Sequence, residues 1–265
     1  MNTFKDIIIK KEHINQIPVL MISSKEEIKK PVIFLFHKIL EDKTQELPIA
    51  LKLAENGFFV CIIDMCGHGE RENSYYKKSA YNFNGLFKDI YGTATDVREV
   101  MDFLHHDKSK ELDFDNVGVI GVSIGGSVAL TASYLIAEVK FAASVIGTCN
   151  WHYLVENDMF RSFRFFSETP EVLDSKKVQA DIEKYEHCNN ITSSNSVPIL
   201  FQHGLCDMGI PIKCVNEYYE KISEIYTQYG KEESLKLIKY KKAGHKITSE
   251  MAIDLVNWVK EQIKK

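Results

Sequence analysis

Short apolar runs alternate along this chain with longer segments in which apolar residues recur at helical spacing. The runs at residues 31–36 and 58–63 are apolar almost throughout, which is typical of strands buried on both faces of a parallel sheet. Residues 4–10 and 17–22 alternate in polarity instead, which predicts two antiparallel strands joined near residues 12–13.

The whole pattern predicts an α/β fold. Strands are expected at residues 4–10, 17–22, 31–36, 58–63, 116–120, 141–146, 198–201 and 235–240. Helices are expected at residues 46–56, 86–106, 127–135, 211–229 and 247–264. Because strand and helix alternate, we expect a mostly parallel sheet of eight strands with helices on both faces. The length of 265 residues suits a single domain, residues 1–265.

One segment interrupts the alternation. Residues 150–196 are longer than a simple crossover between two strands requires, and their first half is rich in aromatic residues. An insertion after the carboxyl end of a strand can form a lid, which makes Trp151 and Phe160 candidates for a substrate-binding wall. The alternative for each aromatic residue is that it packs the insertion onto the core.

The stretch of residues 121–126 has the sequence GVSIGG and follows a predicted strand at the start of a predicted helix. A serine between glycines at such a junction is the nucleophile-elbow pattern. The turn is sharp, so the flanking residues must lack bulk. The serine hydroxyl then projects from the sheet beside the unpaired amides of a helix N-terminus. Ser123 is therefore the candidate nucleophile, and an idle serine in a glycine-rich turn is the alternative.

A serine nucleophile needs a histidine base and a carboxylate that orients the base. After an elbow serine the chain order is serine, acid, histidine, and Asp207 and His245 each follow a predicted strand. The alternatives are a helix cap for Asp207 and a surface-loop residue for His245. His203 is expected to be structural, and Cys206 is a weak candidate nucleophile because no elbow surrounds it.

Composition excludes several other functions. The net charge of −4, without a basic stretch interleaved with aromatics, argues against nucleic acid as a partner. The six cysteines are scattered, which favours free thiols in a reducing cytoplasm and provides no metal-ligand spacing. We expect no signal peptide, no membrane span, no metal and no cofactor. His68 is a candidate substrate contact whose alternative is loop hydrogen bonding, and Asp64 is expected to fix the same loop.

Five motifs follow one another along the chain: HKI at residues 37–39, DMCGHGER at 64–71, GVSIGG at 121–126, HGLCD at 203–207 and GH at 244–245. In this order they resemble the α/β-hydrolase superfamily, and more closely the small bacterial esterases of the dienelactone-hydrolase and prolyl-oligopeptidase-like branch. The resemblance covers residues 30–262 and implies oxyanion donors at the backbone amides of Ile39 and Ile124.

The chain departs from this resemblance in two places. Lys38 stands where the family has glycine, and a lysine adopts positive φ less readily. Ser123 stands where dienelactone hydrolases have cysteine, which favours simple ester hydrolysis. The resulting expectation is a cytoplasmic serine carboxylesterase acting on small-molecule esters. Thioesterase activity, acyl-peptide hydrolysis and a non-catalytic binding protein of this fold are the alternatives.

Overall fold

The computed structural model describes residues 6–26, 29–72, 83–157, 159 and 176–263. Its centre is an eight-stranded sheet in the order β1-β2-β4-β3-β5-β6-β7-β8. Strand β2 runs antiparallel to both of its neighbours, and the pairings from β4 through β8 are parallel. The strands are β1 (Ile7–Ile14), β2 (Ile17–Ser24), β3 (Lys30–Phe36), β4 (Phe59–Ile63), β5 (Leu112–Val122), β6 (Val139–Val145), β7 (Ile199–Gly204) and β8 (Leu235–Tyr240). The expected α/β class and mostly parallel eight-stranded sheet are confirmed.

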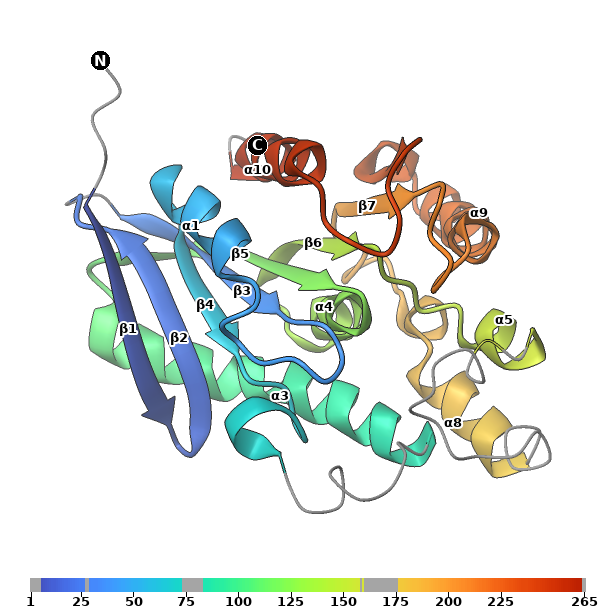
Figure 1. The fold of residues 1–265 in the computed structure, drawn as a ribbon, viewed down its shortest axis with the longest axis horizontal. Coiled ribbons are helices and arrows are strands. Elements are labelled where there is room, and N and C mark those ends of the chain that lie inside the picture. The colour runs from blue at the N-terminus through green and yellow to red at the C-terminus, as the bar shows by residue number, and fades with distance from the viewer. Residues whose placement is uncertain (1–5, 27–28, 73–82, 158, 160–175, 264–265) are drawn as a thin grey trace.

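Helices cover both faces of this sheet (Figure 1). Helices α1 and α10 pack on one face, and α3, α4 and α9 pack on the other. The described helices are α1 (Leu47–Glu55), α3 (Phe83–Lys108), α4 (Ile124–Leu135), α5 (Trp151–Glu156), α8 (Lys176–Tyr185), α9 (Ile212–Gln228) and α10 (Ser249–Ile263). Short 3-10 turns lie at η1 (Gly69–Arg71), η2 (His187–Asn190) and η3 (Glu232–Ser234).

Strand β3 shows why the central strands are apolar throughout. Phe34 and Phe36 enter the core shared with α3, α4 and α9, whereas Ile33 and Leu35 enter the core shared with α1 and α10. All four side chains are fully buried. Successive residues of a strand point to opposite faces, so a strand covered on both sides needs apolar residues at every position.

The first hairpin corrects one boundary. Strands β1 and β2 are joined at Asn15 and Gln16, with φ of 46° and 70°, and not near residues 12–13. Two-residue hairpin loops of this kind need positive φ at both central positions, which asparagine tolerates. The polar residues 10–13 mark exposed strand rather than a turn, because β1 lies at the edge of the sheet.

The segment of residues 150–196 is described only in part. Helix α5 precedes residues 158 and 160–175, which lie outside the described residues, and α8 packs against α3 after them. The lid therefore stays a prediction. Among the helices that the structure describes, none is long and apolar enough to cross a bilayer.

Candidate active site

Ser123 occupies a strained turn between β5 and α4. Its φ of 54° and ψ of −118° lie outside the regions that most residues adopt. A side chain at Gly121 would collide with the backbone of Gly125, and a side chain at Gly125 would collide with backbone carbonyls of Phe36 and His37. Both glycines are thus required by close backbone approach, which is the steric reason expected for the GVSIGG stretch.

Three side chains far apart in the sequence meet at the carboxyl edge of the sheet. The Ser123 Oγ lies 2.9 Å from His245 Nε2, and His245 Nδ1 lies 2.8 Å from Asp207 Oδ2. Ser123 and Asp207 are buried, whereas the His245 side chain is 28% exposed. The structure brings together the three residues that the sequence predicts as nucleophile, acid and base.

The loop after β7 holds the Asp207 carboxylate in place. Its Oδ1 accepts hydrogen bonds from the amides of Gly209 and Ile210, both at 2.9 Å, which leaves Oδ2 for His245. The residue that caps α9 is Pro211, so the helix-cap alternative for Asp207 is wrong.

Hydrogen bonds also keep Asp207 ionised. Burial by itself raises the pKa of this carboxyl, but the hydrogen bonds from His245 and from the Ile210 amide outweigh it and hold the pKa below its usual value. An ionised acceptor at Oδ2 favours the His245 tautomer with its proton on Nδ1. That tautomer leaves Nε2 free to accept the proton of Ser123.

His203 contacts the Asp207 carboxylate and the loop that carries it. It is fully buried, and its Nε2 donates to the Ile210 carbonyl at 2.7 Å while lying 3.3 Å from Asp207 Oδ2. Burial lowers the pKa of His203, so the ring is neutral and its Nε2–H serves as a donor. The sequence prediction of a structural role fits these contacts.

The loops that carry the acid and the base are tied directly together. The Leu205 amide donates to the Tyr240 carbonyl, and the Cys206 amide donates to the Ala243 carbonyl, both at 2.9 Å. A side chain at Gly204 would collide with that same Ala243 carbonyl. The motif glycine at 204 therefore permits the approach of the two loops that sets the spacing of Asp207 and His245.

The two expected oxyanion donors lie on adjoining segments. Ile124 is the first residue of α4, so its amide has no acceptor within the helix. Ile39 follows β3 and is half-buried. The positive φ in its loop falls on Leu40, at 59°, and not on Lys38. Lys38 therefore does not carry the positive φ that is costly for a residue with a side chain.

His37 fastens the start of this loop. Its Nδ1 donates to the Lys38 carbonyl at 2.8 Å, and its Nε2 accepts the Met65 amide at 3.1 Å. Burial lowers the pKa of His37 to about 4, so the ring is neutral at pH 7, as this donor and acceptor pair requires. The sequence showed His37 only as part of a motif. Its role as a loop anchor was not visible there, because its partner Met65 follows β4 and is far away in the sequence.

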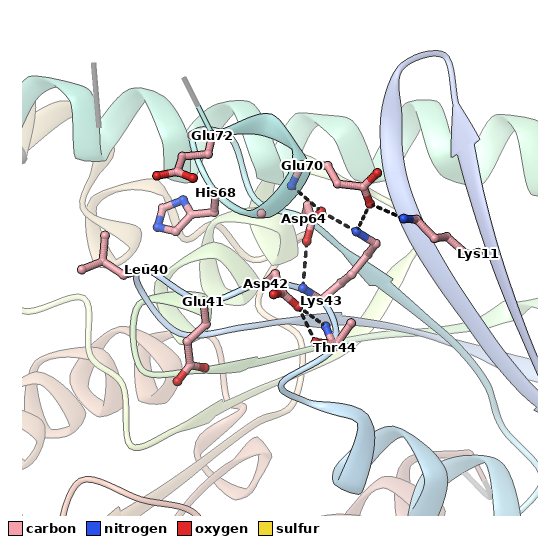
Figure 2. Close-up of a pocket in the computed structure, with 12 residues that line it drawn as sticks. Lys11, Leu40, Glu41, Asp42, Lys43, Thr44, Asp64, His68, Glu70 and Glu72 are labelled. Carbon is pink, nitrogen blue, oxygen red and sulfur yellow. Dashed lines mark hydrogen bonds and ion pairs between the residues drawn. The ribbon is translucent and has the colours of Figure 1, made fainter. Parts of the chain in front are cut away.

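A polar pocket of about 480 Å³ is lined by residues 40–44 of the loop after β3 and by residues of the loop after β4 (Figure 2). In this view Lys43 reaches toward Asp64 and Glu70, and Lys11 approaches Glu70 from β1. The remaining lining residues are Leu40, Glu41, Asp42, Thr44, Gly67, His68, Gly69 and Glu72. Sequence reasoning missed Lys43, since no local pattern distinguishes it from a surface lysine.

The three candidate substrate contacts have different outcomes. Trp151 is 3% exposed and packs edge-on against Phe87 at 5.2 Å between ring centroids, which favours the packing alternative. His68 lines the 480 Å³ pocket but is 3% exposed and donates from Nδ1 to the Cys66 carbonyl at 2.8 Å. Phe160 lies outside the described residues.

Within the described part of the chain, no three His, Cys, Asp or Glu side chains are arranged to hold a metal ion. All six cysteines are free, as expected. The exposed Cys206 thiol donates to the Lys241 carbonyl at 3.3 Å, on the outside of the acid loop.

Most of the chain matches a known protein family. Residues 48–265 match the prolyl oligopeptidase family, peptidase family S9. The chain belongs to this family. It is 26% identical over 258 residues to a Bacillus subtilis (strain 168) protein named "Putative esterase YitV", covering 94% of this chain and 97% of that one.

Solved structures show how far the fold is shared. TT1662 from Thermus thermophilus matches over 98% of this chain and 99% of its own, with a TM-score of 0.74 and 20% identity. Acylaminoacyl peptidase from Pyrococcus horikoshii matches 100% of this chain with a TM-score of 0.73 and 14% identity, but over 42% of its own length. The protein is thus a serine hydrolase of the prolyl oligopeptidase family with the α/β-hydrolase fold.

Proposed function

We propose that this member of the prolyl oligopeptidase family is a carboxylesterase that uses Ser123, His245 and Asp207 as its catalytic triad. The observation that carries the proposal is the continuous hydrogen-bonded chain from the Ser123 hydroxyl through both nitrogens of His245 to the Asp207 carboxylate. The similarity to the Bacillus subtilis protein named as an esterase supports the same class of substrate.

The reaction follows from these contacts. His245 Nε2 takes the Ser123 proton as Oγ attacks the ester carbonyl, and the carbonyl electron pair becomes an oxyanion. The Asp207 carboxylate stabilises the resulting imidazolium. Return of the carbonyl expels the alkoxide, which receives the proton from His245 and leaves an acyl-enzyme at Ser123. Water, activated by the same histidine, then hydrolyses the acyl group.

The backbone amides of Ile39 and Ile124 are the proposed donors to the oxyanion. The amide of Ile124 begins α4, where the helix dipole adds a favourable potential for negative charge. Donors held in place before the reaction need no reorganisation when the charge develops, so each is expected to contribute about 10²- to 10³-fold to kcat.

The decisive experiment is the Ser123→Ala variant with short-chain p-nitrophenyl esters. We expect loss of the serine-dependent turnover and of covalent labelling by a fluorophosphonate probe, with an unchanged thermal unfolding midpoint. Wild-type activity should survive dialysis against a chelator, because the proposed reaction uses no metal. A Ser123→Ala protein that hydrolyses the esters as fast as wild type would refute the proposal.

Two observations bear on the alternatives. Membership of the prolyl oligopeptidase family favours acyl-peptide hydrolysis as the second candidate, and the same triad would perform it. Comparing an acyl-amino-acid p-nitroanilide with the corresponding p-nitrophenyl ester separates the two activities. A non-catalytic binding protein would have no use for the aligned serine, histidine and carboxylate, and it would take up no fluorophosphonate.

A further inference from the structure

The connection between β3 and α1 must be positioned by side chains. Residues 37–46 of this loop are neither helix nor strand, and Leu40 adopts a left-handed conformation that costs about 1–2 kcal/mol for a residue with a side chain. Local contacts within the loop include a Lys38–Glu41 ion pair at 2.9 Å and hydrogen bonds from Thr44 to the Asp42 carboxylate. None of these contacts fixes the loop relative to the sheet.

Lys43 fixes this loop to the sheet. Its backbone amide donates to Asp64 Oδ1 at 2.8 Å, and its ammonium group lies 2.5 Å from Asp64 Oδ2. The same ammonium also contacts the Glu70 carboxylate. Lys43 therefore binds the residue that immediately follows β4 through both its main chain and its side chain.

The ion pair is buried, which makes its geometry rigid. The side chain of Lys43 is 5% exposed and that of Asp64 is fully buried. Burial by itself lowers the pKa of Lys43, but the Asp64 and Glu70 carboxylates outweigh this and raise the pKa above its ordinary value. A buried charge whose partner is removed is strongly unfavourable, so the two groups stay in contact.

Asp64 fixes a second loop at the same time. Its Oδ2 accepts the Glu70 amide at 3.0 Å, and a side chain at Gly69 would collide with the carboxyl group. This contact supports the sequence prediction that Asp64 fixes residues 67–71. Glu70 in turn lies 3.1 Å from Lys11 and 3.2 Å from His13 on β1, at the exposed end of the network.

We propose that Lys43 is a positioning residue for the oxyanion hole, acting through its buried ion pair with Asp64 to hold the loop that carries the Ile39 amide. This inference rests on the proposed esterase function. The His37 ring anchors one end of the loop to the Met65 amide, and Lys43 anchors it five residues beyond Lys38. The Ile39 side chain packs against the core, and its amide lies along the chain between these two anchors.

The test is the Lys43→Met variant, which removes the ammonium group, keeps a long side chain and leaves the backbone hydrogen bond to Asp64. Kinetics are expressed per active site, counted by complete fluorophosphonate labelling, so that unfolded protein does not contribute. We expect kcat to fall by about 10²-fold, as for displacement of a reacting group by about 1 Å, with KM little changed. Lys11→Met is the matched control, because Lys11 contacts Glu70 but not Asp64.

A trifluoromethyl ketone and its reduced alcohol separate positioning from a general structural role. Ser123 adds to the ketone carbon, its proton passes to His245, and the carbonyl electron pair becomes an oxyanion in the hole. The alcohol occupies the site without forming an oxyanion. We expect Lys43→Met to weaken ketone binding by the same factor as kcat and to leave alcohol binding unchanged.

Asp64→Asn removes the charge and one of the two acceptor oxygens, so it disrupts the same ion pair from its other side and covers the case in which Lys43→Met does not fold. It should weaken ketone affinity in the same direction. Unchanged ketone affinity per labelled site in the folded variant refutes the positioning role alone. A wild-type protein that takes up no fluorophosphonate instead contradicts the proposed function, and the inference falls with it.

Discussion

The Asp207→Asn substitution tests the proposed triad because it changes charge and hydrogen bonding with almost no change of shape. Oδ1 of Asp207 accepts the Gly209 and Ile210 amides, and Oδ2 accepts His245 Nδ1. An asparagine must place its NH₂ group at one of these two positions. Facing the two amides, NH₂ would leave the buried Ile210 N–H unsatisfied, at about 1–3 kcal/mol, and also the half-buried Gly209 N–H.

The side chain of the variant is therefore expected to point its NH₂ group toward His245. That orientation keeps both loop amides satisfied and gives up the 3.3 Å contact with His203 Nε2, whose N–H keeps the Ile210 carbonyl as its acceptor. His245 must then accept at Nδ1 and carry its proton on Nε2, facing Ser123. A protonated Nε2 cannot take the serine proton. We expect kcat to fall by about 10⁴-fold, which corresponds to about 5 kcal/mol of transition-state stabilisation.

The measurement is kcat per folded molecule for a short-chain p-nitrophenyl ester. It is made at a pH where the wild-type enzyme is fully active, such as pH 7.5. Asp254→Asn is a matched control, because the Asp254 carboxylate on α10 accepts a hydrogen bond from the Tyr240 hydroxyl at 2.8 Å and is not part of the triad. An Asp207→Asn enzyme within tenfold of wild type would show that Asp207 does not set the tautomer of His245.

Two further predictions concern stability. Gly121→Ala should lower the free energy of unfolding by about 3 kcal/mol and reduce activity, because the new methyl group meets the Gly125 backbone. Gly230 has φ 66° and open surroundings, so Gly230→Ala should lower the free energy of unfolding by only about 1 kcal/mol. Equal losses for the two variants in a denaturant titration would contradict this reasoning. His37 has a folded-state pKa of about 4, lowered by burial from 6.5. The unfolded chain therefore binds a proton first as pH falls, so wild type should lose up to about 3 kcal/mol of stability between pH 6.5 and 4 from this group. His37→Gln should lose correspondingly less over that interval, and identical pH slopes would exclude the effect.

The fold was largely predictable because its signals are local. The apolar runs at β3 and β4 follow from burial on both faces, and the amphipathic spacing of residues 86–106 lies within α3. The hairpin turn was misplaced because exposed edge strands carry polar residues and resemble loops. Asn15 and Gln16 take positive φ without a glycine to indicate it.

The sequence by itself determined the candidate nucleophile, acid and base. Steric demands at an elbow and the order of motifs along a parallel sheet restrict each role to one residue, so Ser123, Asp207 and His245 could be named before any contact was known. Only the tertiary structure decided how their surroundings are held. Lys43 and Asp64 are 21 residues apart, and Ser123 and His245 are 122 apart. Whether a lysine is a solvated surface residue or a buried anchor depends on what the chain packs around it, and neither spacing nor composition encodes that burial.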